Sequence, residues 1–126
     1  MKRLILNLGT IMLLATAFVQ AGFKSAQQRD NTPLSYTGEI MDATCAGQQS
    51  HSPEMEKEGT KSAKDCALLC GKDRNKLVLY NSEAETSLNL SNQAKAREYA
   101  AEKVAIVGTY DGPTKSVQIQ SIAAAP

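Results

Sequence analysis

The residues of this chain that are best suited to chemistry lie in one stretch of the sequence, between Asp42 and Cys70. This stretch holds the only histidine, His51, and all three cysteines, Cys45, Cys66 and Cys70. Three thiolates and one imidazole form the Cys3His ligand set of tetrahedral zinc sites, and thiolates also bind Cu(I). One interpretation is therefore a zinc or copper site made by these four residues, although their spacings match no standard zinc motif.

A second interpretation is a disulfide bond, which forms readily in an oxidising compartment. Cys66 and Cys70 lie four residues apart on a predicted helix, 63–70, so their Cβ atoms should be about 5–6 Å apart. A disulfide requires about 3.8 Å, so we expect Cys45 to pair with Cys70, or otherwise with Cys66. The closed loop would stabilise the fold by about 3.5 kcal/mol and would leave one thiol over. A free or redox-active thiol is the third interpretation.

Two residues of this stretch also have simpler interpretations. A lone histidine such as His51 is more often exposed in a loop than bound to a metal. Asp42, directly after a predicted strand, is more often a turn former that bonds its own backbone than a general base. The sequence shows no Ser/His/Asp set and no Gly-rich loop for phosphate, so we expect no enzymatic activity.

The order of these residues resembles a family of small secreted bacterial proteins of unknown function with an OB-fold-like domain. The shared features are a Gly-x-Ile-x-Asp-x-x-Cys start, a nearby histidine, a helix with two cysteines and a closing Val-x-Val-x-Gly strand. Here they are Gly38 to Cys45, His51, Cys66 with Cys70, and Val104 to Gly108. The resemblance extends from about Tyr36 to Ile122 and implies a fold but no activity.

The first 21 residues have the composition of a cleavable signal peptide. Lys2 and Arg3 form a basic start, a mostly apolar run follows, and Val19-Gln20-Ala21 is a small-x-small cleavage site. We expect Gly22 to be the new N-terminus, with a flexible lead-in over 22–34. The mature protein would then work in the periplasm or outside the cell, with no membrane span after cleavage.

Composition argues against nucleic acid as a partner. Loss of the leader, which carries two basic residues and no acidic one, changes the net charge from +1 to −1. The chain has no Trp, and Phe23 would be the only Phe left, so stacking platforms for bases are scarce.

Apolar periodicity predicts one small domain over 35–122 with a loose tail over 123–126. Alternating or short apolar runs predict five strands, and turn residues separate them. The stretch 42–60 is polar and broken by glycine and proline, and its charge run 54–58 is expected to be a solvated loop or a single helical turn. Gly71 is expected to end the helix that holds Cys66 and Cys70, and Ser91 to cap a second helix over about 92–101. The predicted strands are 35–41, 76–81, 86–90, 103–110 and 116–122.

This order predicts a mainly β fold, a small five-stranded OB-fold-like barrel with a helix between strands three and four. A helix-containing insert would join strands one and two. The expected core is Leu77, Leu79, Leu88, Leu90, Val104, Ile106, Val117 and Ile119.

The expected function is a non-enzymatic domain without a cofactor that binds a small ligand or a protein partner. OB-folds bind ligands partly through the connection between strands one and two, and here that connection holds the cysteines and the histidine. Candidate ligand-face residues are Asp42, His51 and Asp111. The alternatives are a zinc- or copper-binding protein and a thiol redox protein.

Overall fold

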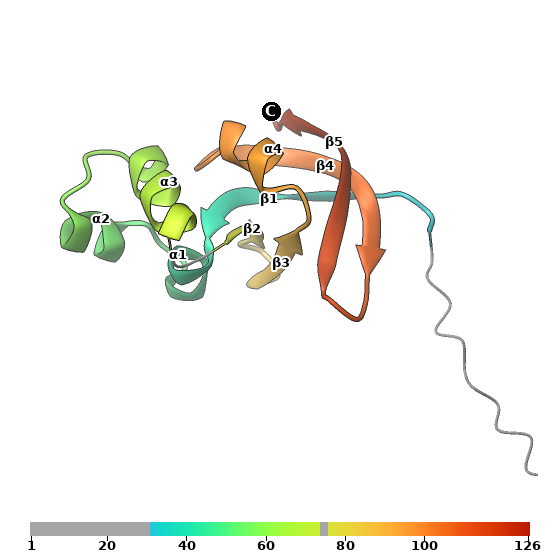
Figure 1. Cartoon of the computed structure of the whole chain (residues 1–126), viewed down its shortest axis with the longest axis horizontal. Helices are drawn as coiled ribbons and strands as arrows, with labels where there is room; N and C mark the ends of the chain where they lie inside the picture. The colour runs from blue at the N-terminus through green and yellow to red at the C-terminus, as the bar shows by residue number, and fades with distance from the viewer. Residues whose placement is uncertain (1–30, 74–75) are drawn as a thin grey trace, which may run out of the picture.

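The computed structural model describes residues 31–73 and 76–126 (Figure 1). The expected signal peptide and the lead-in up to residue 30 lie outside the described residues. Five strands and four helices occupy the described part of the chain. They are β1 (Leu34–Asp42), α1 (Ala43–Gln48), α2 (Ser52–Glu58), α3 (Ala63–Asp73), β2 (Leu77–Asn81), β3 (Thr86–Leu90), α4 (Gln93–Glu98), β4 (Lys103–Asp111) and β5 (Ser116–Ala124).

The five strands form one sheet that closes into a ring in the order β1-β2-β3-β5-β4, because β1 also pairs with β4. All neighbours are antiparallel except β3 and β5, which run parallel. Helix α4 follows β3 and packs at one end of the ring. Its Gln93 side chain bonds the backbone N–H and C=O of Leu77 and the C=O of Leu90. The prediction of five strands in one closed sheet, with a helix between the third and fourth, is therefore confirmed.

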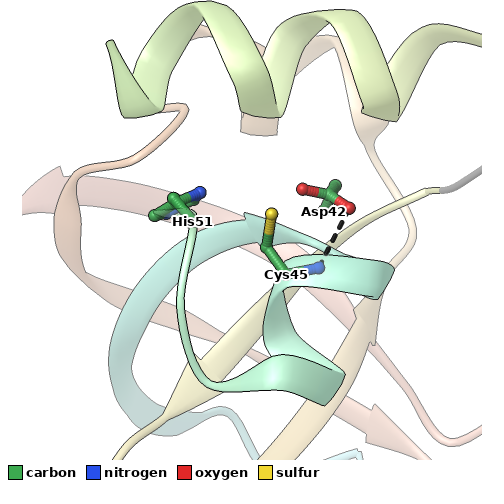
Figure 2. A group of neighbouring side chains, drawn as sticks. All are labelled: Asp42, Cys45 and His51. Atoms are coloured by element: carbon green, nitrogen blue, oxygen red, sulfur yellow. Dashed lines mark hydrogen bonds between the residues drawn. The ribbon is translucent and has the colours of Figure 1, made fainter. Parts of the chain in front are cut away.

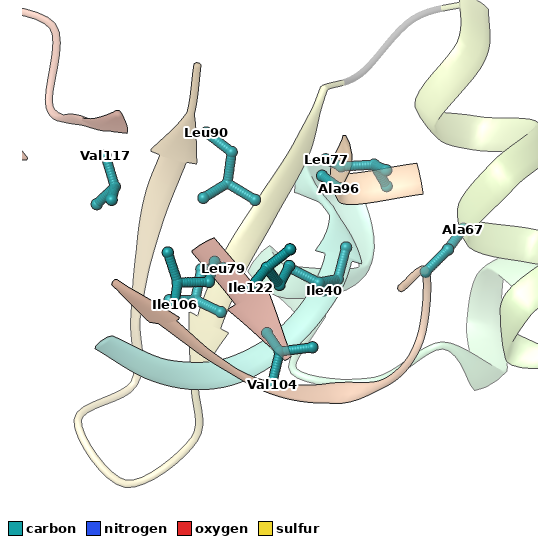
Figure 3. Packing of buried hydrophobic residues seen from close by; sticks show 11 residues of the cluster. Ile40, Ala67, Leu77, Leu79, Leu90, Ala96, Val104, Ile106, Val117 and Ile122 are labelled. Atoms are coloured by element: carbon teal, nitrogen blue, oxygen red, sulfur yellow. The ribbon is translucent and has the colours of Figure 1, made fainter. Parts of the chain in front are cut away.

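The interior of the ring is the main hydrophobic core (Figure 3). Six of the eight residues expected there are buried in it, whereas Leu88 and Ile119 are half-buried and pack against it. Helices contribute small residues, Ala67 from α3 and Ala96 from α4, which lets both helices lie close to the sheet. The buried set is Ile40, Ala67, Leu77, Leu79, Leu90, Ala96, Ala100, Val104, Ile106, Val117 and Ile122.

The outer face of β1 and β2 is covered by the insert, which comprises α1, α2 and α3. Side chains alternate between the two faces of a strand, so Ile40 points into the ring while Met41 points to the insert. The side chains of β2 also alternate between the ring and the insert. Because both faces of β2 are covered, its sequence is an unbroken apolar run. The cluster under the insert contains Met41, Cys45, Ala46, Cys66, Val78 and Tyr80, with Met55 and Cys70 partly buried beside it.

The insert is more helical than the sequence predicts. The charge run 54–58 is not a solvated loop but lies in α2, and the stretch before it forms α1. The caps of α1 and α2, Gln49 and Gly59, are in the left-handed conformation. The acidic run is not wholly solvated either, since Glu54 is buried and is bonded by the Gln48 amide and the Lys57 ammonium. These contacts supply the local stabilisation that composition alone does not reveal.

Several predicted boundaries also need correction. Helix α3 continues past Gly71, which is buried where a Cβ would lie 3.0 Å from a Leu77 methyl, so close packing explains this glycine. The side chain that caps α4 is Asn92, which accepts from the Lys95 N–H, and not Ser91. Strand β5 continues to Ala124, so most of the expected tail is paired with β4. Over 31–73 and 76–126, no helix has both the length and the apolar character needed to cross a membrane.

Candidate metal centre

Asp42 is the last residue of β1, and its side chain is completely buried. One carboxylate oxygen, Oδ1, accepts hydrogen bonds from the backbone N–H groups of Thr44 (3.0 Å) and Cys45 (3.2 Å). This is the N-cap of α1, so the interpretation of Asp42 as a residue that bonds its own backbone is confirmed. The other oxygen, Oδ2, is buried and has no hydrogen-bond partner among the described residues.

Cys45 lies in α1, where the capped helix start places its thiol beside the Asp42 carboxylate (Figure 2). The residue is fully buried. Burial raises the pKa of Cys45 well above its ordinary value, and the nearby Asp42 carboxylate and Cys66 thiol raise it further. Without a cation this thiol is therefore neutral.

His51 precedes α2 and is not the exposed loop histidine that the sequence suggests, because its side chain is only 11% exposed. Its Nε2 atom lies 2.8 Å from Oε1 of Glu39 on β1. When Nε2 donates to this carboxylate, the free lone pair of the ring is on Nδ1. Nδ1 is buried and lacks a hydrogen-bond partner in the described part of the chain.

The ligand atoms of Asp42, Cys45 and His51 all lie within 4.8 Å of one another. Figure 2 shows the three side chains pointing toward one another, with the ribbon of α3 passing beside them. One carboxylate, one thiol and one imidazole are ligand types that zinc accepts together. Glu39 behind His51 completes the carboxylate–histidine arrangement that orients metal-bound imidazoles.

Glu39 is the residue of this group that sequence reasoning missed. The sequence contains one signal for it, because Glu39 and Met41 are two residues apart on β1 and their side chains therefore lie on the same face of the strand. The sequence does not show that the insert covers this face.

The remaining two cysteines lie on α3. Cys66 is fully buried in the same apolar cluster as Cys45, and Cys70 packs against that cluster. Cys70 is half-buried, and burial together with the Cys66 thiol raises its pKa to about 11. All three cysteines are free thiols, with no two sulfur atoms at bonding distance. The expected disulfide of Cys45 with Cys70 or Cys66 is thus not present and stays a prediction for oxidised protein.

Asp111, the third residue expected on a ligand face, is not part of this group. It ends β4 at the hairpin to β5, and its Oδ2 accepts a 2.6 Å hydrogen bond from the Thr114 hydroxyl. In Figure 1 this hairpin lies at the other end of the molecule from the insert. The structure therefore brings Asp42, Cys45 and His51 together and leaves Asp111 apart.

A cavity of about 550 Å³ lies beside the cluster, between the insert and the rim of the ring. His51 and Glu39 are part of its wall, whereas Asp42 and Cys45 are not. Other lining residues are Met55, Tyr80, Glu83 and Lys103. His51 thus separates the buried cluster from a solvent-connected space.

Comparisons with protein families, with curated proteins and with solved structures find no match for this chain.

Proposed function

We propose that this chain is an exported metal-binding domain in which Asp42, Cys45 and His51 hold a transition-metal ion, zinc or copper. The observation that supports this proposal is a pair of buried atoms, Asp42 Oδ2 and His51 Nδ1, that lack partners in the described structure. They belong to two residues whose ligand atoms lie within 4.8 Å of each other and of the Cys45 thiol.

These two atoms cost free energy as long as they lack partners. A buried polar group without a partner costs about 1–3 kcal/mol, and more if it is charged. Both atoms are acceptors when Nε2 of His51 carries the proton, so neither can satisfy the other. The Cys45 thiol is only a weak donor. A cation between the three side chains would pair with all of them at once.

The fold supports a binding role for the connection between β1 and β2. The strand order, the parallel contact of β3 with β5 and the position of α4 support an OB-fold-like barrel as the finer description. OB-folds bind ligands through this connection, and here it is the insert that carries the cluster. We therefore propose a binding protein and not an enzyme.

Metal titration tests the proposal directly. Mature protein, reduced and kept free of oxygen, is titrated with zinc and separately with Cu(I) against a coloured competing chelator. We expect about one ion per chain, and we expect His51→Ala to weaken binding by more than about tenfold because it removes a ligand and its support from Glu39. Glu56→Gln, on the exposed side of α2, is the matched control and should bind as the wild type does. Reduced wild-type protein that retains no metal would refute the proposal.

The cavity beside His51 favours a second candidate function, the binding of a small ligand. Its volume of about 550 Å³ falls within the range of ligand pockets. Its walls combine the thioether of Met55 and the ring of Tyr80 with the charges of Glu83 and Lys103. A screen of small molecules for thermal stabilisation, repeated on Lys103→Ala, tests this candidate, which fails if no stabilising compound depends on Lys103.

Export is the remaining part of the proposal and is supported by the basic start, the apolar run and the Val19-Gln20-Ala21 site. N-terminal sequencing of protein expressed in a bacterium with a periplasm should find Gly22, or a residue within one or two of it, at the start of the mature chain. An intact Met1 on cytoplasmic protein would contradict export.

A further inference from the structure

We propose that Cys66 is the fourth ligand of this centre, and that the ion is a zinc ion held in a closed Asp-Cys-His-Cys site. This inference rests on the metal-binding function proposed above and deepens it. It names the donor that completes the coordination, the kind of ion and its task.

The position of Cys66 is the first argument. The three clustered ligands come from the end of β1, from α1 and from the residue before α2, so α3 is the element of the insert that supplies none of them. Helix α3 packs against both β1 and α1 and passes beside the cluster in Figure 2. Cys66 is near its start, is 0% exposed, and packs in the same buried apolar cluster as Cys45, although its sulfur is not within 4.8 Å of all three ligand atoms.

The contrast with Cys70 is the second argument. Cys70 is one turn further along α3, is half-buried, and neighbours the Cys66 thiol. Cys66 instead lies within the buried apolar cluster that also contains Cys45, whereas Cys70 packs against that cluster from outside. Of the two thiols on α3, Cys66 is therefore the buried one that shares an apolar cluster with Cys45, and Cys70 is the one at the partly exposed edge of that cluster.

The donor set is the third argument. Four protein ligands in a buried place leave no position open, which is the arrangement of structural zinc sites, whereas catalytic sites keep one position for water. Cu(I) favours soft sulfur donors, so a centre that includes the Asp42 carboxylate and the His51 imidazole fits zinc better. Met41 and Met55 pack in the same apolar cluster and would fill space around the site.

The task of such an ion follows from what the insert is made of. The cluster beneath it contains few large apolar side chains, chiefly Met41, Val78 and Tyr80. A zinc ion would link four parts of the chain through its ligands. These parts are the end of β1, helix α1, the residue before α2, and helix α3. It would thus hold the three-helix insert on the outer face of the ring.

Cobalt substitution tests the inference, because Co²⁺ enters tetrahedral zinc sites and each cobalt–thiolate bond adds to the sulfur-to-metal charge-transfer absorption. Reduced wild-type protein loaded with Co²⁺ should show the intensity of two such bonds. Cys66→Ser should lose about half of it, and Cys70→Ser, the matched control on the same helix, should lose none. A wild-type protein that binds no cobalt and no zinc would refute the proposed function itself. If the wild type binds cobalt but Cys66→Ser has the same spectrum, only the role of Cys66 is refuted. The role of Cys66 is also refuted if Cys70→Ser loses as much charge-transfer absorption as Cys66→Ser does.

A second measurement avoids reliance on a variant that fails to fold. X-ray absorption at the zinc edge of the wild-type protein counts sulfur neighbours at about 2.3 Å separately from nitrogen and oxygen neighbours at about 2.0–2.2 Å. Two of each support the assignment. One sulfur or three sulfurs would overturn it.

Discussion

At the scale of single residues, Asp42 divides two tasks between its two carboxylate oxygens. Oδ1 caps α1 and so fixes the backbone that carries Cys45, while Oδ2 is buried and has no hydrogen-bond partner within 31–73 and 76–126. The first task needs only a hydrogen-bond acceptor, whereas the second needs a negative charge. The two tasks can therefore be separated by substitution.

Asp42→Asn should keep the cap and weaken the centre. Asn caps helices as well as Asp does, so the free energy of unfolding of metal-free protein should change by less than about 1 kcal/mol. Zinc affinity should fall by more than about tenfold, because the charged ligand is lost. Urea unfolding with a chelator present measures the first effect and competition titration the second. Asp42→Ala, the companion variant, should lose about 1 kcal/mol of stability as well as metal affinity. Equal zinc affinity for Asp42→Asn and wild type would exclude Asp42 as a ligand.

Glu39→Gln should weaken zinc binding by about 10–100-fold without removing a ligand. The Glu39 carboxylate holds Nε2 of His51 at 2.8 Å, and support of this kind orients the imidazole and increases its basicity. Glu83→Gln is the control, because Glu83 lines the same cavity but is not bonded to His51. Competition titration measures the zinc affinity of both variants. If both lose the same affinity, the cause is the negative charge of the cavity and not the hydrogen bond from Glu39 to His51.

At the scale of elements, β1 and β2 serve two structures at once, with one face in the ring and the other under the insert. The two strands also approach each other closely at Gly38. A Cβ on Gly38 of β1 would lie 2.4 Å from the Tyr80 carbonyl oxygen on β2, closer than any real Cβ contact. Gly38 is thus a packing requirement of the strand pair that supports the centre.

Gly38→Ala should destabilise the protein by about 1–3 kcal/mol, the usual cost of overpacking, because backbone and not a flexible side chain must move. Gly112→Ala is the control, since a Cβ at Gly112 would meet nothing within 4 Å. Urea denaturation of both variants in the presence of a chelator measures the difference. A Gly38→Ala protein as stable as the Gly112→Ala protein would show that β1 and β2 are not in this contact.

The strands were predictable because their signal is local. Runs such as Leu77 to Tyr80, and the alternation of Val117 with Ile119, report burial directly, and the closed sheet follows from their number and order. Helices α1 and α2 were not predictable, because helices of six or seven residues depend on tertiary contacts such as those of buried Glu54. The stretch that holds the site was likewise predictable from residue types. The pairing of His51 with Glu39 was not, since it depends on the insert folding over β1.

At the scale of the whole molecule, the ring and the insert have separate apolar clusters of unequal size. The ring cluster has long aliphatic residues from all five strands, whereas the insert cluster is smaller and richer in sulfur. The insert is therefore the part whose stability should depend on a metal ion.

Zinc should raise the stability of the protein by about 2.7 kcal/mol at a free concentration one hundred times the dissociation constant, because the ion binds the folded state alone. Hydrogen exchange should locate the gain, with greater protection over 43–73 than in the strands of the ring. Magnesium, which favours oxygen ligands, is the control ion and should change neither region. Protection that rises equally in both regions would argue against a metal seated in the insert.

The pairing of β1 with β4 has a consequence for the speed at which this chain folds. Leu34 lies opposite Gly108, so β1 pairs with a strand whose residue lies 74 positions later in the chain. Contacts between such distant positions slow folding, since the chain between them must be ordered first. The ring cannot close until almost the whole domain has been synthesised. Slow closure of the ring would be compatible with the export proposed above, because an unfolded chain can still pass through a secretion channel.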